Sequence, residues 1–223
     1  MTAFSSASTA RRPTCAACLR AQTACICRFV TPVASSVELL VLQHPLEVGN
    51  AKNSARLLHL CLPGSRLLAS ETFDPAELDA VLHADGRTPL LLYPETPGEA
   101  ALGLPAPPAI DAAALAQPAS LRLVLLDATW RKSRKMLYLN PSLQRLPRLA
   151  LQGLPPSAYR IRKAHAPDQL SSLEAAAHAL AQLENRPGHY APLFEAFDGF
   201  VEALLAHSAN GWPSFSRQGR VLK

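Results

Sequence analysis

Short apolar runs alternate with helical segments along most of this chain, and that alternation limits the folds it can adopt. Runs rich in Leu and Val are expected as buried strands, and the longer periodic stretches between them as helices. Strands that alternate with helices pair in parallel, so the sequence predicts an α/β domain whose mainly parallel sheet has helices on both faces. The predicted strands are 37–43, 65–69, 90–93, 121–126 and 148–151, and the predicted helices are 52–62, 74–83, 111–117, 129–139, 171–184 and 190–207.

A chain of 223 residues is long enough for one main domain with a small appendage. We expect a tail over 1–14, a cysteine-rich knuckle over 15–30 and the main α/β domain over 31–223. No apolar run reaches the roughly 18 residues that span a membrane, and residues 1–14 lack the apolar stretch of a secretory signal. The sequence therefore predicts a cytoplasmic protein without disulfides. No protein partner is evident, and a monomer is the preferred state.

Four of the five cysteines lie close together near the N-terminus. Cys15-x-x-Cys18 is followed, after six residues, by Cys25-x-Cys27. Four thiolates at this spacing match the ligand set of a structural zinc site, with an iron–sulfur cluster and a metal-free segment as alternatives. Metal binding would supply the folding energy that so short a segment lacks. The fifth cysteine, Cys61, lies on an apolar helix face and is expected as a packed core thiol.

Positive charge is concentrated in one stretch of the chain. The formal net charge is +5, and residues 121–165 hold ten of the 22 Lys and Arg but one of the 17 Asp and Glu. Such a stretch favours a phosphate backbone as partner, although solvated helix faces would give the same count. The candidate phosphate-binding residues are Arg131, Lys132, Arg134, Lys135, Arg160, Arg162 and Lys163.

An acidic residue, Asp127, directly follows the 121–126 strand, and a helix is predicted from Thr129. Ligands of open α/β sheets bind beyond the carboxyl ends of the strands, so Asp127 is a candidate for the reaction centre. The alternative is that Asp127 only caps the helix. Trp130 is either a core anchor or a platform on which a base stacks.

These residues belong to motifs that resemble those of one known family. Asp127-Ala128-Thr129-Trp130, followed by Arg131-Lys132-Ser133-Arg134-Lys135-Met136, resembles the signature of the DTW-domain family. The four-cysteine cluster is similar to that of the family as well, and Ser172 replaces an expected threonine but keeps its hydroxyl. Further similar motifs follow in the family's order: Gln43-His44-Pro45-x-Glu47 with Lys52 and Asn53, Tyr93-Pro94, Arg162-Lys163, and Leu170-Ser171-Ser172-Leu173-Glu174-Ala175.

The resemblance implies a tRNA-uridine aminocarboxypropyltransferase with a SPOUT-like fold and a C-terminal knot. Its donor would be S-adenosylmethionine, its partner tRNA, and its product 3-(3-amino-3-carboxypropyl)uridine. An RNA methyltransferase of the same superfamily and a non-catalytic, zinc-stabilised RNA-binding module are the alternatives. The resemblance implies catalytic roles for Asp127, Thr129 and Trp130, and cofactor-binding roles for Leu92, Tyr93, Pro94, Asp127, Leu170, Ser171 and Ser172.

Several residues of these motifs have more than one expected role. Asp127 is the candidate base for the N3 proton of the uridine. Cations in the basic stretch would weaken it as a base, so orientation of N3–H or pairing with the donor's ammonium is the alternative. Ser171 is also expected to form a capping box with Glu174. His44 and Glu47 serve either the site or a local turn.

Overall fold

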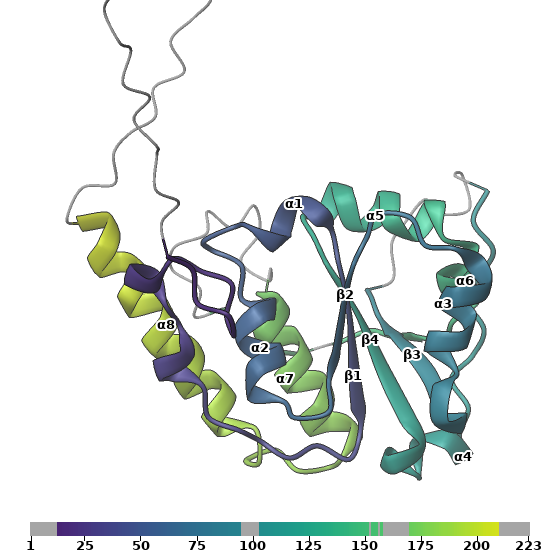
Figure 1. Ribbon diagram of the computed structural model, residues 1–223. Helices are drawn as coiled ribbons and strands as arrows, with labels where there is room; N and C mark the ends of the chain where they lie inside the picture. The colour runs from purple at the N-terminus through teal and green to yellow at the C-terminus, as the bar shows by residue number, and fades with distance from the viewer. Residues whose placement is uncertain (1–12, 95–102, 152, 156, 158–169, 210–223) are drawn as a thin grey trace, which may run out of the picture.

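The computed structural model describes residues 13–94, 103–151, 153–155, 157 and 170–209. Its strands form a single sheet in the order β2-β1-β4-β3-β5, and every neighbouring pair is parallel (Figure 1). The predicted parallel sheet is confirmed. The strands are β1 (Glu38–Gln43), β2 (Arg66–Ala69), β3 (Thr88–Leu92), β4 (Leu121–Asp127) and β5 (Arg148–Leu149).

Every helix predicted from the sequence is present, and two further short helices occur. These are α1 and α6, which each start at a proline and are too short for an apolar period to reveal them. The helices are α1 (Pro45–Val48), α2 (Ala55–Cys61), α3 (Pro75–Leu82), α4 (Ala112–Leu115), α5 (Trp130–Leu139), α6 (Pro141–Gln144), α7 (Ser172–Leu183) and α8 (Ala191–Ala209). Single 3-10 turns also occur, at η1 (Gln22–Ala24), η2 (Cys27–Phe29), η3 (Ala84–Gly86) and η5 (Pro118–Ser120).

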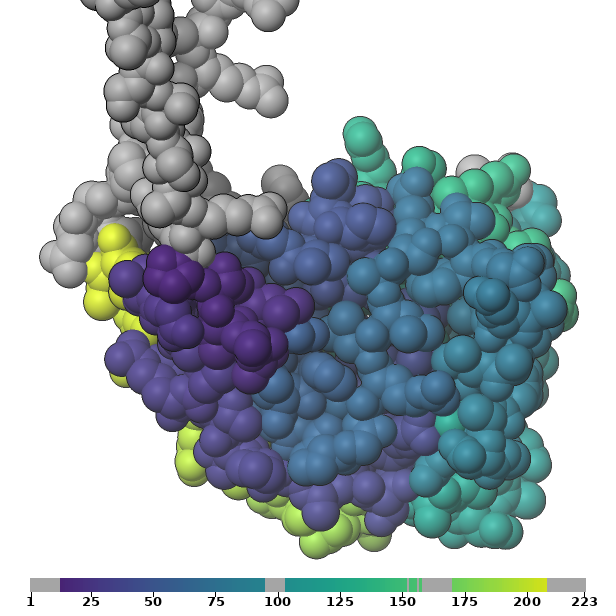
Figure 2. Space-filling model, viewed as in Figure 1, coloured from purple at the N-terminus to yellow at the C-terminus, as the bar shows by residue number. Residues whose placement is uncertain are grey.

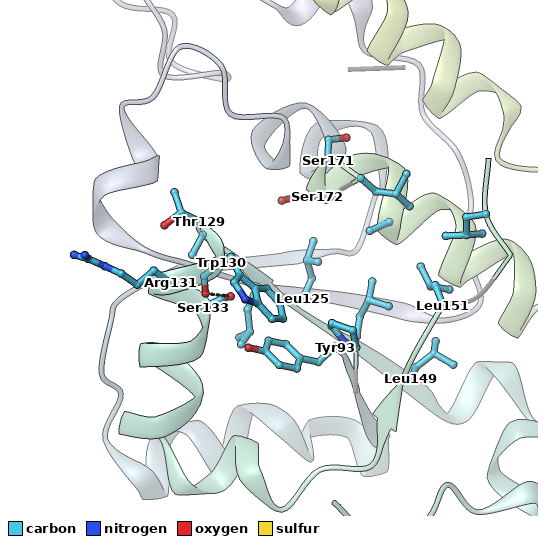
Figure 3. A pocket seen from close by; sticks show the side chains of 17 residues that line it. Tyr93, Leu125, Thr129, Trp130, Arg131, Ser133, Leu149, Leu151, Ser171 and Ser172 are labelled. Carbon is cyan, nitrogen blue, oxygen red and sulfur yellow. Dashed lines mark hydrogen bonds between the residues drawn. The ribbon is translucent and has the colours of Figure 1, made fainter. Parts of the chain in front are cut away.

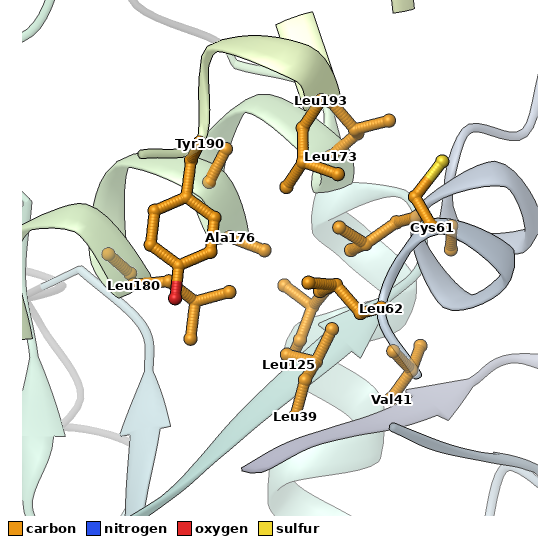
Figure 4. Packing of buried hydrophobic residues seen from close by; sticks show 14 of the residues in the cluster. Leu39, Val41, Cys61, Leu62, Leu125, Leu173, Ala176, Leu180, Tyr190 and Leu193 are labelled. Atoms are coloured by element: carbon orange, nitrogen blue, oxygen red, sulfur yellow. The ribbon is translucent and has the colours of Figure 1, made fainter. Parts of the chain in front are cut away.

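Helices cover both faces of the sheet, as predicted. Successive side chains of a strand point to opposite faces, so Leu39 and Val41 of β1 pack against α2, α7 and α8 (Figure 4). Leu40 and Leu42 pack on the other face against α3, α5 and α6. Because both faces are covered, all seven residues of β4, the central strand, are buried. Cys61 is fully buried in the first of these clusters, so its predicted core role is confirmed.

The cysteine-rich segment lies on the surface of the domain beside α8, as Figure 2 shows in purple and yellow. Cys18 and Ile26 are buried in the same cluster that holds α2, α7 and α8. Phe29 packs closely on α8 at Gly199, where a Cβ atom would lie 2.8 Å from the phenyl ring. A larger residue at that position would displace the segment, so this glycine permits the close contact.

Two predictions, the N-terminal tail and the C-terminal knot, are not tested by the structure. The tail over residues 1–14 falls largely on residues 1–12, which lie outside the described residues. The predicted C-terminal knot is not confirmed, and residues 158–169, between β5 and α7, also lie outside the described residues. Among the helices described, none is long and apolar enough to cross a membrane.

Candidate active site

The parallel sheet brings two polar residues together where the central strands end. Gln43, the last residue of β1, is the register partner of Asp127, the last residue of β4. From β1 the chain continues to β2 on one side of the sheet, whereas β3 lies on the opposite side, next to β4. Such a switch in strand order opens a crevice at the carboxyl ends of an α/β sheet. Asp127 therefore sits where a ligand is expected.

The Asp127 carboxylate accepts hydrogen bonds from three side chains. Its Oδ2 accepts from Gln43 Nε2 at 2.8 Å and from Asn53 Nδ2 at 2.6 Å, and its Oδ1 accepts from Ser172 Oγ at 2.6 Å. All three donors are neutral, and the side chain is almost fully buried. The proposed helix-capping role is wrong, because Thr129 is the N-cap residue of α5 and Asp127 bonds to side chains instead. Within the described residues, no cation of the basic stretch forms an ion pair with Asp127.

Two cavities meet beside this carboxylate. The larger has a volume of about 700 Å³ and is lined mainly by apolar side chains (Figure 3). The smaller has a volume of about 210 Å³ and is lined by Asp127 with polar residues of the 47–54 segment. Ala128, Thr129, Ser171 and Ser172 border both cavities. The larger one brings together six of the predicted cofactor-binding residues: Leu92, Tyr93, Pro94, Leu170, Ser171 and Ser172.

An aromatic pair forms one wall of the larger cavity. The rings of Tyr93 and Trp130 are stacked, with centroids 5.4 Å apart and planes 17° apart (Figure 3). Tyr93 is buried, whereas Trp130 is 43% exposed. The interpretation of Trp130 as a core anchor is therefore wrong. Its exposed surface is available to a planar group at the cavity, which is the geometry of a stacking platform.

Ser171 and Ser172, at the start of α7, form different hydrogen bonds. Ser171 forms the predicted capping box: its Oγ accepts from the Glu174 backbone N–H at 3.2 Å, and Glu174 Oε2 accepts from the Ser171 N–H at 2.7 Å. This box leaves the Ser172 hydroxyl free to donate to Asp127. Capping thus fixes the first turn of α7 in the place from which Ser172 reaches the site.

The four basic residues at the start of α5 differ in what they contact. Lys132 Nζ pairs with Glu47 at 2.9 Å, and Lys135 Nζ pairs with Glu71 at 2.9 Å. Arg131 and Arg134 are exposed and form no ion pair with any residue that the structure describes. The remaining predicted phosphate-binding residues, Arg160, Arg162 and Lys163, lie outside the described residues.

His44 and Glu47, two buried residues of the first family motif, belong to the same network of contacts around α5. His44 Nδ1 accepts from the Leu46 backbone N–H at 3.1 Å, so its Nε2 donates to Glu71 at 3.0 Å. Glu71 thus contacts both His44 and Lys135, and the pKa of its carboxyl is lowered by Lys135 first and His44 second. Glu47 accepts from Asn50 as well as Lys132. These acids hold α5 to α1 and to the loop that follows β2.

The four clustered cysteines converge in a way that suits one metal ion. Their four sulfur atoms all lie within 4.8 Å of one another. The Cys15–Cys27 and Cys18–Cys25 pairs each have Sγ atoms 3.7 Å apart. Four sulfurs at about 2.3 Å from a tetrahedral zinc ion would be separated by roughly 3.8 Å. Backbone N–H groups of Cys18 and Ala17 lower the pKa of Cys15 to about 6, whereas burial raises the pKa of Cys27.

Comparison with known proteins identifies the family. The model of the DTW domain matches residues 12–205, most of the chain. This chain belongs to the DTW domain family. It is 32% identical over 212 residues to tRNA-uridine aminocarboxypropyltransferase 2 of Mus musculus, covering 89% of this chain and 66% of that protein. The protein of the same name from Drosophila melanogaster is 33% identical over 185 residues, covering 79% of this chain and 69% of its own length.

A third relative gives the same picture. The protein of that name from Macaca fascicularis is 29% identical over 211 residues, with 89% of this chain and 66% of that protein covered. The DTW chain described here thus spans about two thirds of the length of these relatives. No solved structure matches it.

Sequence reasoning did not assign three residues of this DTW domain to the site. Gln43 and Asn53 bind Asp127 directly, and Glu71 anchors Lys135. A signal for Gln43 was present, because it ends a buried strand as Asp127 does, and parallel strands end at the same edge. Asn53 belongs to the first family motif, which was a second signal, but it precedes α2 instead of lying in the predicted helix 52–62. Glu71 lies in a loop, where no periodicity indicates which side chains turn toward the site.

Proposed function

We propose that this chain is a tRNA-uridine aminocarboxypropyltransferase that uses S-adenosylmethionine as its donor. The single observation that carries the proposal is the meeting of an apolar and a polar cavity beside the buried Asp127. The donor has two matching parts, a planar adenosine with a large aromatic surface and a charged amino-acid tail, which are joined at a sulfonium. The names of the relatives agree with this activity.

Each part of the donor has a matching part of the site. The larger cavity suits the adenosine, because leucines and Tyr93 line it and polar groups are few. The smaller cavity suits the charged tail and the edge of the uracil ring, because Glu47, Lys52 and Asn53 line it with Asp127. The carbon to be transferred would then lie near the shared border at Thr129 and Ser172, within reach of the polar side.

The chemistry needs alignment and the loss of one proton. The uridine N3 forms a bond to the γ-carbon of the tail while the carbon–sulfur bond breaks. The electron pair of the broken carbon–sulfur bond stays on the sulfur and neutralises the sulfonium, and methylthioadenosine departs. We propose that Asp127 accepts the N3 proton, because among the described residues its Oδ1 accepts from Ser172 alone and keeps a second lone pair. Gln43 and Asn53 hold the other oxygen and so fix the direction of the carboxylate.

The acceptor RNA would approach along the start of α5. Arg131 borders the larger cavity, and Arg134 lies one turn further along the helix. We propose that these two arginines contact phosphates, while Lys132 and Lys135 are committed to Glu47 and Glu71. Trp130, exposed beside them, would stack on the target base. The residues Arg160, Arg162 and Lys163 stay part of the proposed tRNA surface.

The cysteine cluster would bind structural zinc. Its four thiolates fill all the positions of a tetrahedral ion, which leaves none for a substrate. The proposal therefore gives zinc no step in the reaction. A cytoplasmic location and a monomeric state remain predictions from the sequence.

Nucleoside mass spectrometry tests the function directly. Unmodified tRNA is incubated with the purified chain and S-adenosylmethionine, digested and examined for modified uridine. We expect an aminocarboxypropyl adduct together with an equal amount of methylthioadenosine. A methylated nucleoside with S-adenosylhomocysteine would overturn the proposal in favour of a methyltransferase. Binding of tRNA without any product or donor affinity would favour an RNA-binding module.

A further inference from the structure

The cysteine-rich segment touches the loop that delivers Asn53 to the site. The segment lies beside α8, next to the residues that precede α2 (Figures 1 and 2). Its Arg20 follows the second cysteine ligand by two positions, and the Arg20 backbone carbonyl accepts from the Cys15 N–H at 2.7 Å. The position of Arg20 is therefore tied to the cysteine cluster.

The Arg20 guanidinium reaches across to the backbone of that loop. Its Nη1 donates to the Ala51 carbonyl at 2.7 Å, and its Nη2 donates to the Asn53 carbonyl at 2.9 Å. The guanidinium also lies over the Phe200 ring of α8, 5.0 Å from the ring centroid. A planar fork held from one side by an aromatic ring fixes two carbonyls in one geometry, which a lysine could not reproduce.

Asn53 links this contact to the reaction site within a single residue. Its carbonyl is held by Arg20, and its side-chain Nδ2 donates to Asp127 at 2.6 Å. Its Oδ1 accepts from the Ala55 backbone N–H at 3.0 Å and from Gln43 Nε2 at 3.2 Å. A shift of the Asn53 backbone would therefore move both amides that hold Asp127.

We propose that Arg20 is a positioning residue for the reaction, through which the cysteine cluster sets the Asn53 amide against Asp127. This inference rests on the proposed function, since it gives the cluster a part in orienting the site as well as in folding. The competing explanation is that Arg20 only fastens the segment to the domain. Arg56 provides the comparison, because its Nη2 donates to the Ala17 carbonyl of the segment at 3.1 Å, whereas the Asn53 carbonyl accepts from Arg20.

A double-mutant cycle separates the two explanations. We expect Arg20→Ala to lower kcat by about tenfold to a hundredfold, the range for a misplaced catalytic group, with a small change in the KM for the donor. Arg20→Lys should restore little of this loss. If Arg20 acts through Asn53, the Arg20→Ala/Asn53→Ala double variant should be no slower than Asn53→Ala alone. Multiplicative losses would overturn the proposal, as would an equal loss of kcat in Arg56→Ala.

Amide hydrogen exchange supplies a readout that needs no turnover. We expect Arg20→Ala to speed exchange at Lys52, Asn53 and Ala55, while bound zinc stays at one ion per chain. Arg28→Ala is the matched control, because Arg28 belongs to the same segment and stacks on Phe29 instead. Unchanged exchange in Arg20→Ala would refute the hold on Asn53. If the wild-type chain forms no product but Arg20→Ala still speeds exchange as expected, the result would count against the proposed function alone.

Discussion

Replacing Asp127 by asparagine alters the charge of the site while nearly preserving its shape. The new carbonyl oxygen can accept from Gln43 and Asn53, and the new amide can donate to Ser172, whose hydroxyl also accepts. Three charge-assisted bonds become neutral ones, a loss of about 1 kcal/mol each. The removal of a buried charge offsets part of this loss. We therefore expect Asp127→Asn to fold, with a free energy of unfolding lower by about 1–3 kcal/mol.

The effect on catalysis should be much larger than the effect on stability. A missing proton acceptor costs about 10²–10⁴ in rate, and we expect kcat of Asp127→Asn to fall by that factor. Product formation is followed by nucleoside mass spectrometry under single-turnover conditions, with urea unfolding measured on the same preparation. Asp79→Asn is the matched control, since Asp79 pairs with Arg145 on the surface and lies outside both cavities.

The pH dependence distinguishes a base from an orienting group. If Asp127 takes the N3 proton, hydroxide can replace it, so the residual rate of Asp127→Asn should rise with pH. A residual rate that stays flat with pH would assign Asp127 an orienting role. Near-normal turnover at every pH would refute the reasoning, because neither role would then be needed.

Three further predictions follow from contacts elsewhere in the domain. Arg134→Gln should reduce the slope of log K against log salt for tRNA binding by about 1, whereas Lys135→Gln should leave it nearly unchanged; equal slopes would contradict the division between arginines and lysines. Trp130→Ala should raise the KM for tRNA about tenfold or more and Trp130→Phe much less, and steady-state kinetics showing no difference would exclude stacking. Burial raises the pKa of Glu184, but the Val37 and Ser36 N–H groups more than offset this and lower it below the ordinary value of 4.5. Its contribution to stability is therefore complete above pH 4.5 and is lost as the pH falls through the lowered pKa. Glu184→Gln should destabilise the domain at pH 7, and thermal unfolding should show that the difference from the wild type shrinks as the pH falls below 4.5.

Several features of the fold were predictable because local spacing determines them. The apolar runs of β1 and β4 are buried on both faces, which is the pattern of a parallel sheet covered by helices. The capping box at Ser171 needs only residues within one turn of helix. Asp127 and Ser172 were both assigned to the site, since strand ends and helix starts gather at one edge of such a sheet.

The count of basic residues did not predict which of them are exposed. Arg122 belongs to the basic stretch, yet it is fully buried, donates to the Val81 and Leu82 carbonyls and pairs with Glu38. Composition cannot distinguish such a residue from an exposed one, because burial depends on what packs around the strand. The same holds for the two lysines of α5, whose acidic partners follow other strands.

The sequence by itself determined the local elements, the four-cysteine spacing and the strand-end motifs, since each depends on residues within a few positions of one another. Only the tertiary structure decided which side chains meet at Asp127. Gln43 and Asn53 lie 84 and 74 positions away from it and reach it because β1 and β4 are neighbours in the sheet. The contact between Arg20 and the Asn53 backbone spans 33 positions and depends on the packing of the cysteine segment against α8. Strand order and surface packing are properties of the whole core, and no short stretch of residues encodes them.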